Sequence, residues 1–79
     1  MLNLAGSYIV PIKAREIERV AQKLGFQKAR QKGSHARWKH PDGRATTISV
    51  HGNNEIGGWL FNEIIKQLGV TKDTFNDLL

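Results

Sequence analysis

A short basic stretch of the chain, residues 27–44, contains a histidine, a residue type that can act as a catalytic base. Gly33, Ser34 and His35 follow one another there, and Asp42 is the one acid of the stretch. Its six basic residues are Lys28, Arg30, Lys32, Arg37, Lys39 and Arg44. The rest of the chain has equal numbers of basic and acidic residues, so the formal net charge of +5 arises within this stretch. A positive charge concentrated in this way indicates a polyanionic ligand.

One chemistry that a histidine among arginines and lysines could support is cleavage of an RNA phosphodiester. RNA carries its own nucleophile, the 2′-hydroxyl beside each phosphate, so a protein needs to remove that proton and stabilise the charge that develops on the phosphate. Imidazole has an ordinary pKa of roughly 6.5 and is therefore available as a base near neutral pH. Arginine and lysine side chains nearby would hold the phosphate. His35 is therefore a candidate base, and the alternative is a chemically idle surface histidine at a turn, satisfied by water.

Length and composition limit the kind of protein. With 79 residues the chain is near the lower limit for an apolar core without metals or disulfides, so we expect one domain over residues 1–79, with residues 1–10 as a short, frayed lead-in. The absence of cysteine excludes disulfides, thiol catalysis and Cys-ligated zinc, and it fits a cytoplasmic location. No window approaches the roughly 18 consecutive apolar residues that span a membrane. We therefore expect a soluble protein with no membrane partner.

A β-hairpin is predicted to carry the histidine. Residues 36–40 and 44–50 alternate between apolar and polar types and flank Pro41-Asp42-Gly43, which suits a three-residue turn. That turn pairs His35 with Ser49, and the even-numbered residues then form an apolar face that packs on helices. The residues expected together on the opposite, solvent-exposed face are His35, Arg37, Lys39, Thr47, Ser49 and His51.

Helices and one more strand must position this hairpin. Apolar residues at helical spacing predict amphipathic helices over residues 13–24 and 56–68, and residues 26–31 predict a short strand. A last helix over residues 72–79, capped by Thr71, should complete the core with Phe75, Leu78 and Leu79. The order α-β-β-β-α is that of a double-stranded-RNA-binding domain. The predicted fold class is therefore α+β, a three-stranded antiparallel sheet with helices on one face.

Taken together and in order, these motifs resemble the HicA family, the small toxins of bacterial type II toxin–antitoxin pairs. The resemblance runs from about residue 13 to residue 79. Two departures stand out: Trp59-Leu60 replaces a common Gly-Thr pair at the second helix, and Ser49 replaces a common proline. The motifs that carry the resemblance are Gly25-Phe26, Arg30-Gln31-Lys32-Gly33-Ser34-His35, His40-Pro41-Asp42-Gly43-Arg44, Val50-His51 and Ile64-Ile65-Lys66-Gln67 with Gly69.

The resemblance implies a metal-independent endoribonuclease that cleaves mRNA, needs no cofactor and is held inactive by a HicB-like antitoxin that covers the site. It assigns the catalytic role to His35, the residue that charge and hairpin geometry also indicate. The residues expected to contact RNA are Arg30, Lys32, Ser34, Arg37, Lys39 and His51.

Two other interpretations compete with this one. A non-catalytic RNA-binding module of the same fold would use the basic hairpin to contact phosphates while His35 stays idle. A metal site made of His35, His40 and His51 is disfavoured, because the hairpin places His40 on the other face and no carboxylate lies beside the other two. Trp38 could stack on a base, but its even-numbered position favours packing in the core.

Overall fold

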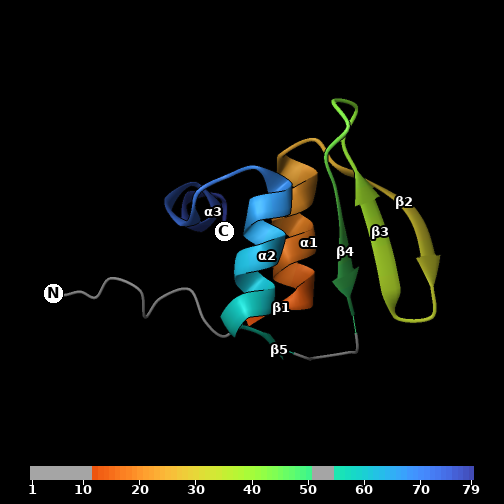
Figure 1. Ribbon diagram of the computed structural model, residues 1–79, viewed down its shortest axis with the longest axis horizontal. Coiled ribbons are helices and arrows are strands. Elements are labelled where there is room, and N and C mark those ends of the chain that lie inside the picture. The colour runs from red at the N-terminus through yellow and green to blue at the C-terminus, as the bar shows by residue number, and fades with distance from the viewer. Residues whose placement is uncertain (1–11, 51–54) are drawn as a thin grey trace, which may run out of the picture.

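The computed structural model describes residues 12–50 and 55–79, so the predicted lead-in and His51 lie outside the described residues. The strands β2 to β5 follow one another in the chain and the last two helices come after them, an α+β arrangement, so the fold class predicted from the sequence is confirmed (Figure 1). The elements are β1 (Ile12–Lys13), α1 (Ala14–Lys23), β2 (Gln27–Lys32), β3 (His35–Lys39), β4 (Ala45–Ser49), β5 (Glu55–Ile56), α2 (Gly58–Leu68) and α3 (Lys72–Leu78).

The central element is an antiparallel sheet of strand order β2-β3-β4, with β2 at one edge. Figure 1 shows α1 and α2 together on one side of this sheet, and no described element covers the other side. The predicted hairpin register is confirmed, because His35 pairs with Ser49 and Arg37 with Thr47. Gly43 has φ 101°, and its N–H donates to the carbonyl of His40 at 3.0 Å, which closes the predicted turn.

The inner face of the sheet consists of the even-numbered residues, as period-two alternation predicts. Ala36 and Trp38 of β3 and Thr46 and Ile48 of β4 are all buried against the helices. The Trp38 indole N–H donates to a Glu18 carboxylate oxygen at 3.0 Å, so its one polar group is satisfied in the core. Trp38 is therefore a packing residue, and its ring is not available to stack on a base.

The apolar side chains that recur at helical spacing in the sequence are buried in the helices, as predicted. In α2, the left-handed residue Gly69 (φ 77°) ends the helix. In α3, the Thr71 hydroxyl accepts the Thr74 N–H at 3.1 Å, and the buried Phe75 ring meets Phe61 edge-on at 5.2 Å. The buried residues of α1 and α2 are Ala14, Ile17, Val20, Ala21, Phe61, Ile64, Ile65 and Leu68.

The expectation that Leu79 completes the core is wrong, because this residue is 42% exposed. Phe75 and Leu78 are three residues apart and share the inner side of α3, whereas Leu79 follows the last helical residue. Leu78 is partly buried against the core, as expected.

A second, two-stranded ladder joins residues at or just before the beginnings of two predicted helices. Ile12 pairs with Ile56 and Lys13 with Glu55, and both isoleucines are buried. Strands of two residues have no periodicity to detect, and these two lie far apart in the sequence. The consequence is that α2 begins only at Gly58.

Candidate active site

A β-bulge in the edge strand determines which basic side chains reach the open face of the sheet. Lys28 pairs with Trp38, but the next pair along the ladder is Arg30 with Arg37, so Ala29 is the extra residue. Without this insertion, strict alternation would place Arg30 on the buried face. The bulge leaves Lys28 on the helix side and places Arg30 on the open side with Arg37.

His35 lies on the same open face, at the start of β3. The turn from β2 contains Gly33 in the left-handed region (φ 58°), and beyond it Lys32 pairs directly with His35. On the other side His35 pairs with Ser49 of β4. The exposed imidazole therefore has a basic neighbour on one strand and a hydroxyl-bearing neighbour on the other.

A shallow hollow of about 430 Å³ occupies this face of the sheet. It has four basic side chains and one histidine, and no acidic side chain lines it. The lining residues are Ala29, Arg30, Lys32, His35, Arg37, Lys39 and Thr47. The hollow is thus built almost entirely from groups that attract or hold an anion.

The cations of the hollow are not neutralised within the described part of the chain. Arg30, Lys32 and Lys39 have no ion-pair partner among these residues, and Arg37 donates to the Thr47 hydroxyl at 3.0 Å. Arg30 and Arg37 face each other directly across the ladder, and such like-charge pairs destabilise a sheet. A bound polyanion would remove that repulsion.

The structure brings together five of the seven residues that the sequence indicated, namely His35, Arg30, Lys32, Arg37 and Lys39. Ser34 is half-buried in the turn, does not line the hollow, and its carbonyl accepts the Val50 N–H at 2.7 Å. His51 lies outside the described residues.

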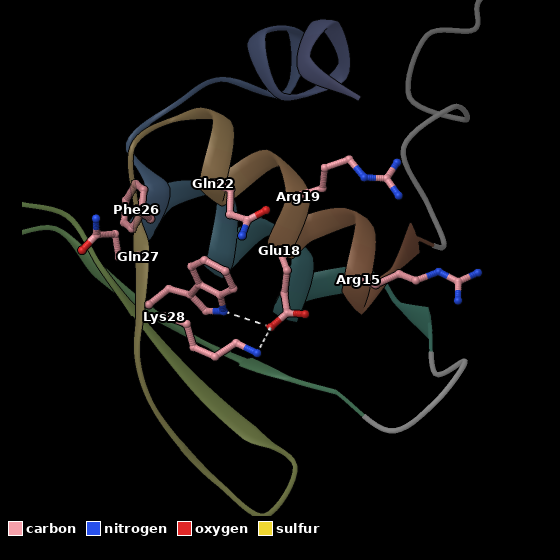
Figure 2. A pocket seen from close by; sticks show the side chains of 8 residues that line it. Arg15, Glu18, Arg19, Gln22, Phe26, Gln27 and Lys28 are labelled. Atoms are coloured by element: carbon pink, nitrogen blue, oxygen red, sulfur yellow. Dashed lines mark hydrogen bonds and ion pairs between the residues drawn. The ribbon is translucent and has the colours of Figure 1, made fainter.

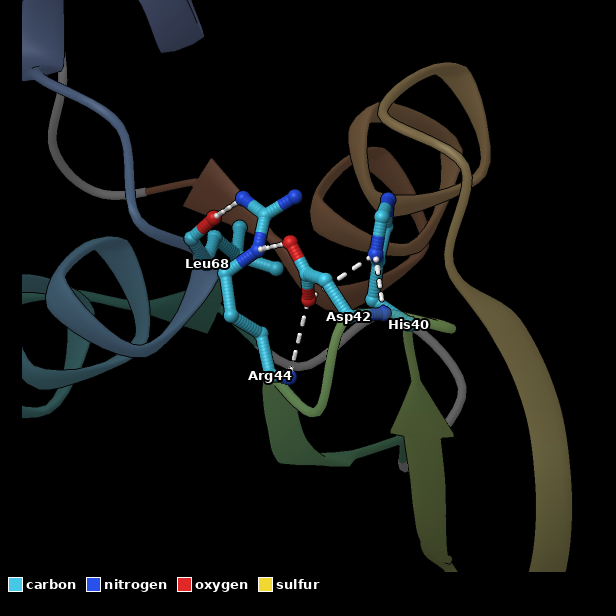
Figure 3. Close-up of polar contacts among 4 residues, drawn as sticks. All are labelled: His40, Asp42, Arg44 and Leu68. Atoms are coloured by element: carbon cyan, nitrogen blue, oxygen red, sulfur yellow. Dashed lines mark hydrogen bonds and ion pairs between the residues drawn. The ribbon is translucent and has the colours of Figure 1, made fainter.

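Arg44, counted with the basic stretch in the sequence, has a different position. Its guanidinium donates to the Leu68 carbonyl at 2.6 Å and to the Asp42 carboxylate at 2.8 Å (Figure 3). The Leu68 carbonyl belongs to the last turn of α2, where a positive charge is favourable. The side chain also lies against Gly69, where a Cβ atom would come within 3.0 Å of it. Arg44 therefore connects the hairpin turn to the end of α2.

His40 and Asp42 complete this cluster at the hairpin turn. The His40 ring packs edge-on against Phe26 at 5.1 Å, and its Nδ1 lies 2.9 Å from an Asp42 carboxylate oxygen (Figure 3). The Arg44 backbone N–H donates to Asp42, and this bond, together with the Arg44 side chain, lowers the pKa of the Asp42 carboxyl below its usual value. The polar side chains of the turn are thus bonded to other groups of the same turn.

A second hollow, of about 390 Å³, lies between α1 and β2 on the helix side of the sheet (Figure 2). Lys28 enters it and lies 3.8 Å from Glu18, the same carboxylate that accepts the Trp38 indole N–H. The sequence analysis grouped Lys28 with the basic hairpin, because a β-bulge cannot be recognised from the alternation of residue types. The structure assigns it to the opposite side.

The departure at residues 59–60 affects the surface at the beginning of α2. Trp59 is 77% exposed and Leu60 39% exposed, so neither contributes to the core. Residue 57, the N-cap, is a glycine and makes no side-chain capping bond. Trp59 and Leu60 therefore lie outside both the core and the hollow around His35.

Within the described ranges 12–50 and 55–79, no three or more His, Asp or Glu side chains group in a way that could hold a metal ion. Among the same residues, none of the helices has the length and apolar character required to cross a membrane.

Comparison with known families identifies the chain. The family model described as "HicA toxin of bacterial toxin-antitoxin" matches residues 14–70, from the first residue of α1 to just past the end of α2. A comparison with curated proteins gives no match. The matched range covers well over half of the chain and includes both the hollow around His35 and the hairpin turn. The chain therefore belongs to the HicA toxin family of bacterial toxin–antitoxin systems.

Proposed function

We propose that this protein is the toxin of a type II toxin–antitoxin pair and an endoribonuclease that cleaves mRNA, with His35 as the general base. One observation carries the proposal: an exposed histidine lies among four cations, with no acid lining the hollow, on the open sheet face of a HicA-family chain. Such a surface attracts phosphates, and the histidine is the group in it best suited to remove a proton.

The proposed reaction uses the nucleophile that RNA contains. His35 takes the proton of a 2′-hydroxyl, and the resulting oxygen attacks the adjacent phosphorus. The bond from phosphorus to the 5′-oxygen breaks, and that oxygen takes up a proton from solvent as it leaves. The product ends are a 2′,3′-cyclic phosphate and a 5′-hydroxyl, and the histidine then returns its proton to solvent.

The surrounding cations would bind and stabilise the phosphate. Arg37 is held in position by its bond to Thr47, and Arg30 lies directly opposite it on β2. Two guanidinium groups on adjacent strands can bind two oxygens of one phosphate or two neighbouring phosphates. Lys32, paired with His35, supplies positive charge beside the reacting group.

The proposed partners follow from the family and from this surface. We assign residues 1–79 to one HicA-like domain that acts in the cytoplasm on mRNA. A HicB-type antitoxin would hold it inactive by covering the hollow. The alternative is a non-catalytic RNA-binding module, supported by the same cations, which bind phosphates whether or not His35 reacts.

The experiment is cleavage of a labelled single-stranded RNA in excess EDTA, followed by analysis of the product ends. We expect cleavage to persist and to leave 2′,3′-cyclic or 3′-phosphate ends. His35→Ala, tested in parallel, should bind the RNA without cutting it. Activity that disappears on chelation and returns with magnesium or zinc would contradict the mechanism. Binding without any product from the wild type would favour the RNA-binding module.

A further inference from the structure

The hollow between α1 and β2, called the groove from here on, contains cations that take no part in the proposed reaction. Arg15 and Arg19 are four residues apart on α1 and therefore extend from the same side of the helix (Figure 2). Both are exposed, and neither has an ion-pair partner within the described part of the chain. Unpaired arginines in a concave surface are suited to bind an external anion.

The one acid in this groove is already engaged. The Glu18 side chain is only 18% exposed, accepts the Trp38 indole N–H at 3.0 Å and lies 3.8 Å from the Lys28 ammonium. The Lys28 side chain is 41% exposed, and its ammonium also donates to the Gln31 side-chain oxygen at 3.1 Å. With three cations and one carboxylate, the groove has a net positive charge.

The groove and the hollow around His35 meet at the edge of the sheet. Gln27 and Lys28 line the groove, and the next two residues, Ala29 and Arg30, line the hollow. The β-bulge lies between them, and every residue of β2 is exposed. At about 3.3 Å per residue, Lys28 and Arg30 are roughly 7 Å apart along the strand. A chain of phosphates can therefore pass around this edge from one cation to the next.

The groove is better suited to a nucleic acid than to an apolar partner. Its two aromatic residues, Phe26 and Trp38, are each 2% exposed, so a protein partner would find little apolar surface there. The large exposed apolar side chains, Trp59 and Leu60, do not line it. The remaining side chains of the groove are charged or carry amides that can pair with bases or phosphates.

We propose that the groove between α1 and β2 is a second RNA-binding subsite. A single strand bound at His35 continues over the edge of β2, and its phosphates contact Arg19 and Arg15 outside the reacting dinucleotide. This inference rests on the proposed function, because it extends the RNA that the open face binds. It makes the protein prefer long single strands to short ones.

The test is the double variant Arg15→Gln/Arg19→Gln, assayed by fluorescence anisotropy over a range of salt concentrations. The probes are 2′-O-methyl oligonucleotides, which lack the free nucleophile and stay intact, of about 4 and about 20 nucleotides, bracketing typical single-strand site sizes. For the long probe we expect weaker binding and a log–log salt slope flatter by about 1.4, the value for two lost phosphate contacts on a single strand. Binding of the short probe should stay unchanged.

The matched control is Lys66→Gln/Lys72→Gln, which removes the same charge from α2 and α3, away from the groove. Thermal unfolding of all variants checks that folding is retained. An unchanged slope for the long probe, or an equal change in the control, would overturn the proposal. An unchanged slope together with a weakened antitoxin complex would assign the groove to protein binding and would also overturn it. If the wild type bound neither probe, the proposed function itself would fail.

Discussion

His35 and His40 lie at the two ends of the same strand, one beginning β3 and the other directly following it. His35 is exposed on the open face among cations. His40 packs against Phe26 and lies 2.9 Å from Asp42. The two imidazoles have the same intrinsic chemistry, so their surroundings decide what each can do. One can accept a proton from a bound molecule, and the other stabilises a turn.

The arginines of the hairpin show the same division. Among the described residues, Arg37 makes one side-chain hydrogen bond, to the Thr47 hydroxyl, and its guanidinium remains on the open face. The Arg44 guanidinium donates hydrogen bonds to Asp42 and to the Leu68 carbonyl. A cation whose donors are already bonded within the protein contributes to folding rather than to ligand binding. The hairpin thus combines an open basic face with a structural turn.

The strongest test of this comparison replaces each of the two histidines in turn. His35→Ala should lower the RNA cleavage rate by roughly 100- to 10,000-fold, as expected for a general base, while stability changes by less than about 0.5 kcal/mol. His40→Ala should reduce the free energy of unfolding by about 1–2 kcal/mol, through lost packing on Phe26 and the lost contact with Asp42. Its folded fraction should cleave at nearly the wild-type rate. Similar effects of both variants on cleavage would show that the distinction is wrong.

A second test concerns the open basic face alone. Arg37→Ala/Lys39→Ala should weaken RNA binding at low salt and flatten the log–log salt slope by about one to two units, because two phosphate contacts are lost. Stability should change little, since both side chains are exposed. RNA titrations at several salt concentrations measure the slope. If the slope of this variant equals that of the wild type, RNA binds elsewhere on the protein.

Arg44→Gln gives the opposite pattern. The Leu68 carbonyl loses a charge-assisted hydrogen bond and Asp42 loses its ionic partner, so we expect the free energy of unfolding to fall by about 1–2 kcal/mol. The salt dependence of RNA binding should equal that of the wild type. Urea denaturation measures the first quantity, and a flatter salt slope would return Arg44 to the binding surface.

The smallest expected effect is the pH dependence of Asp42. Its folded-state pKa lies below the usual value of 3.8, so its carboxylate stabilises the fold above that pH, and the contribution is lost as the pH falls through the lowered pKa. Asp42→Asn should therefore be less stable than the wild type at pH 7, and the gap should narrow in strong acid. Thermal unfolding across this range measures it. A gap of constant size would mean that the carboxylate charge is not its cause.

The sequence predicts much of this fold because the relevant signals are local. Alternation on both sides of Pro41-Asp42-Gly43 gave the correct register for β3 and β4. Helical spacing and caps located α1, α2 and α3 to within a few residues. The pairing of Ile12 with Ile56 was missed, since it depends on two very short segments that meet only in the folded chain.

The sequence alone determined that His35, Arg37 and Lys39 share one face, because a two-residue period and a tight turn leave no other arrangement. Tertiary structure decided which other cations join them. The bulge at Ala29 places Arg30 on the open face, and the position of α1 brings Glu18 within 3.8 Å of the Lys28 ammonium. At the end of α2, the Leu68 carbonyl accepts a hydrogen bond from Arg44. These outcomes depend on hydrogen bonds and ion pairs between segments distant in sequence, which form only when helices and sheet pack together.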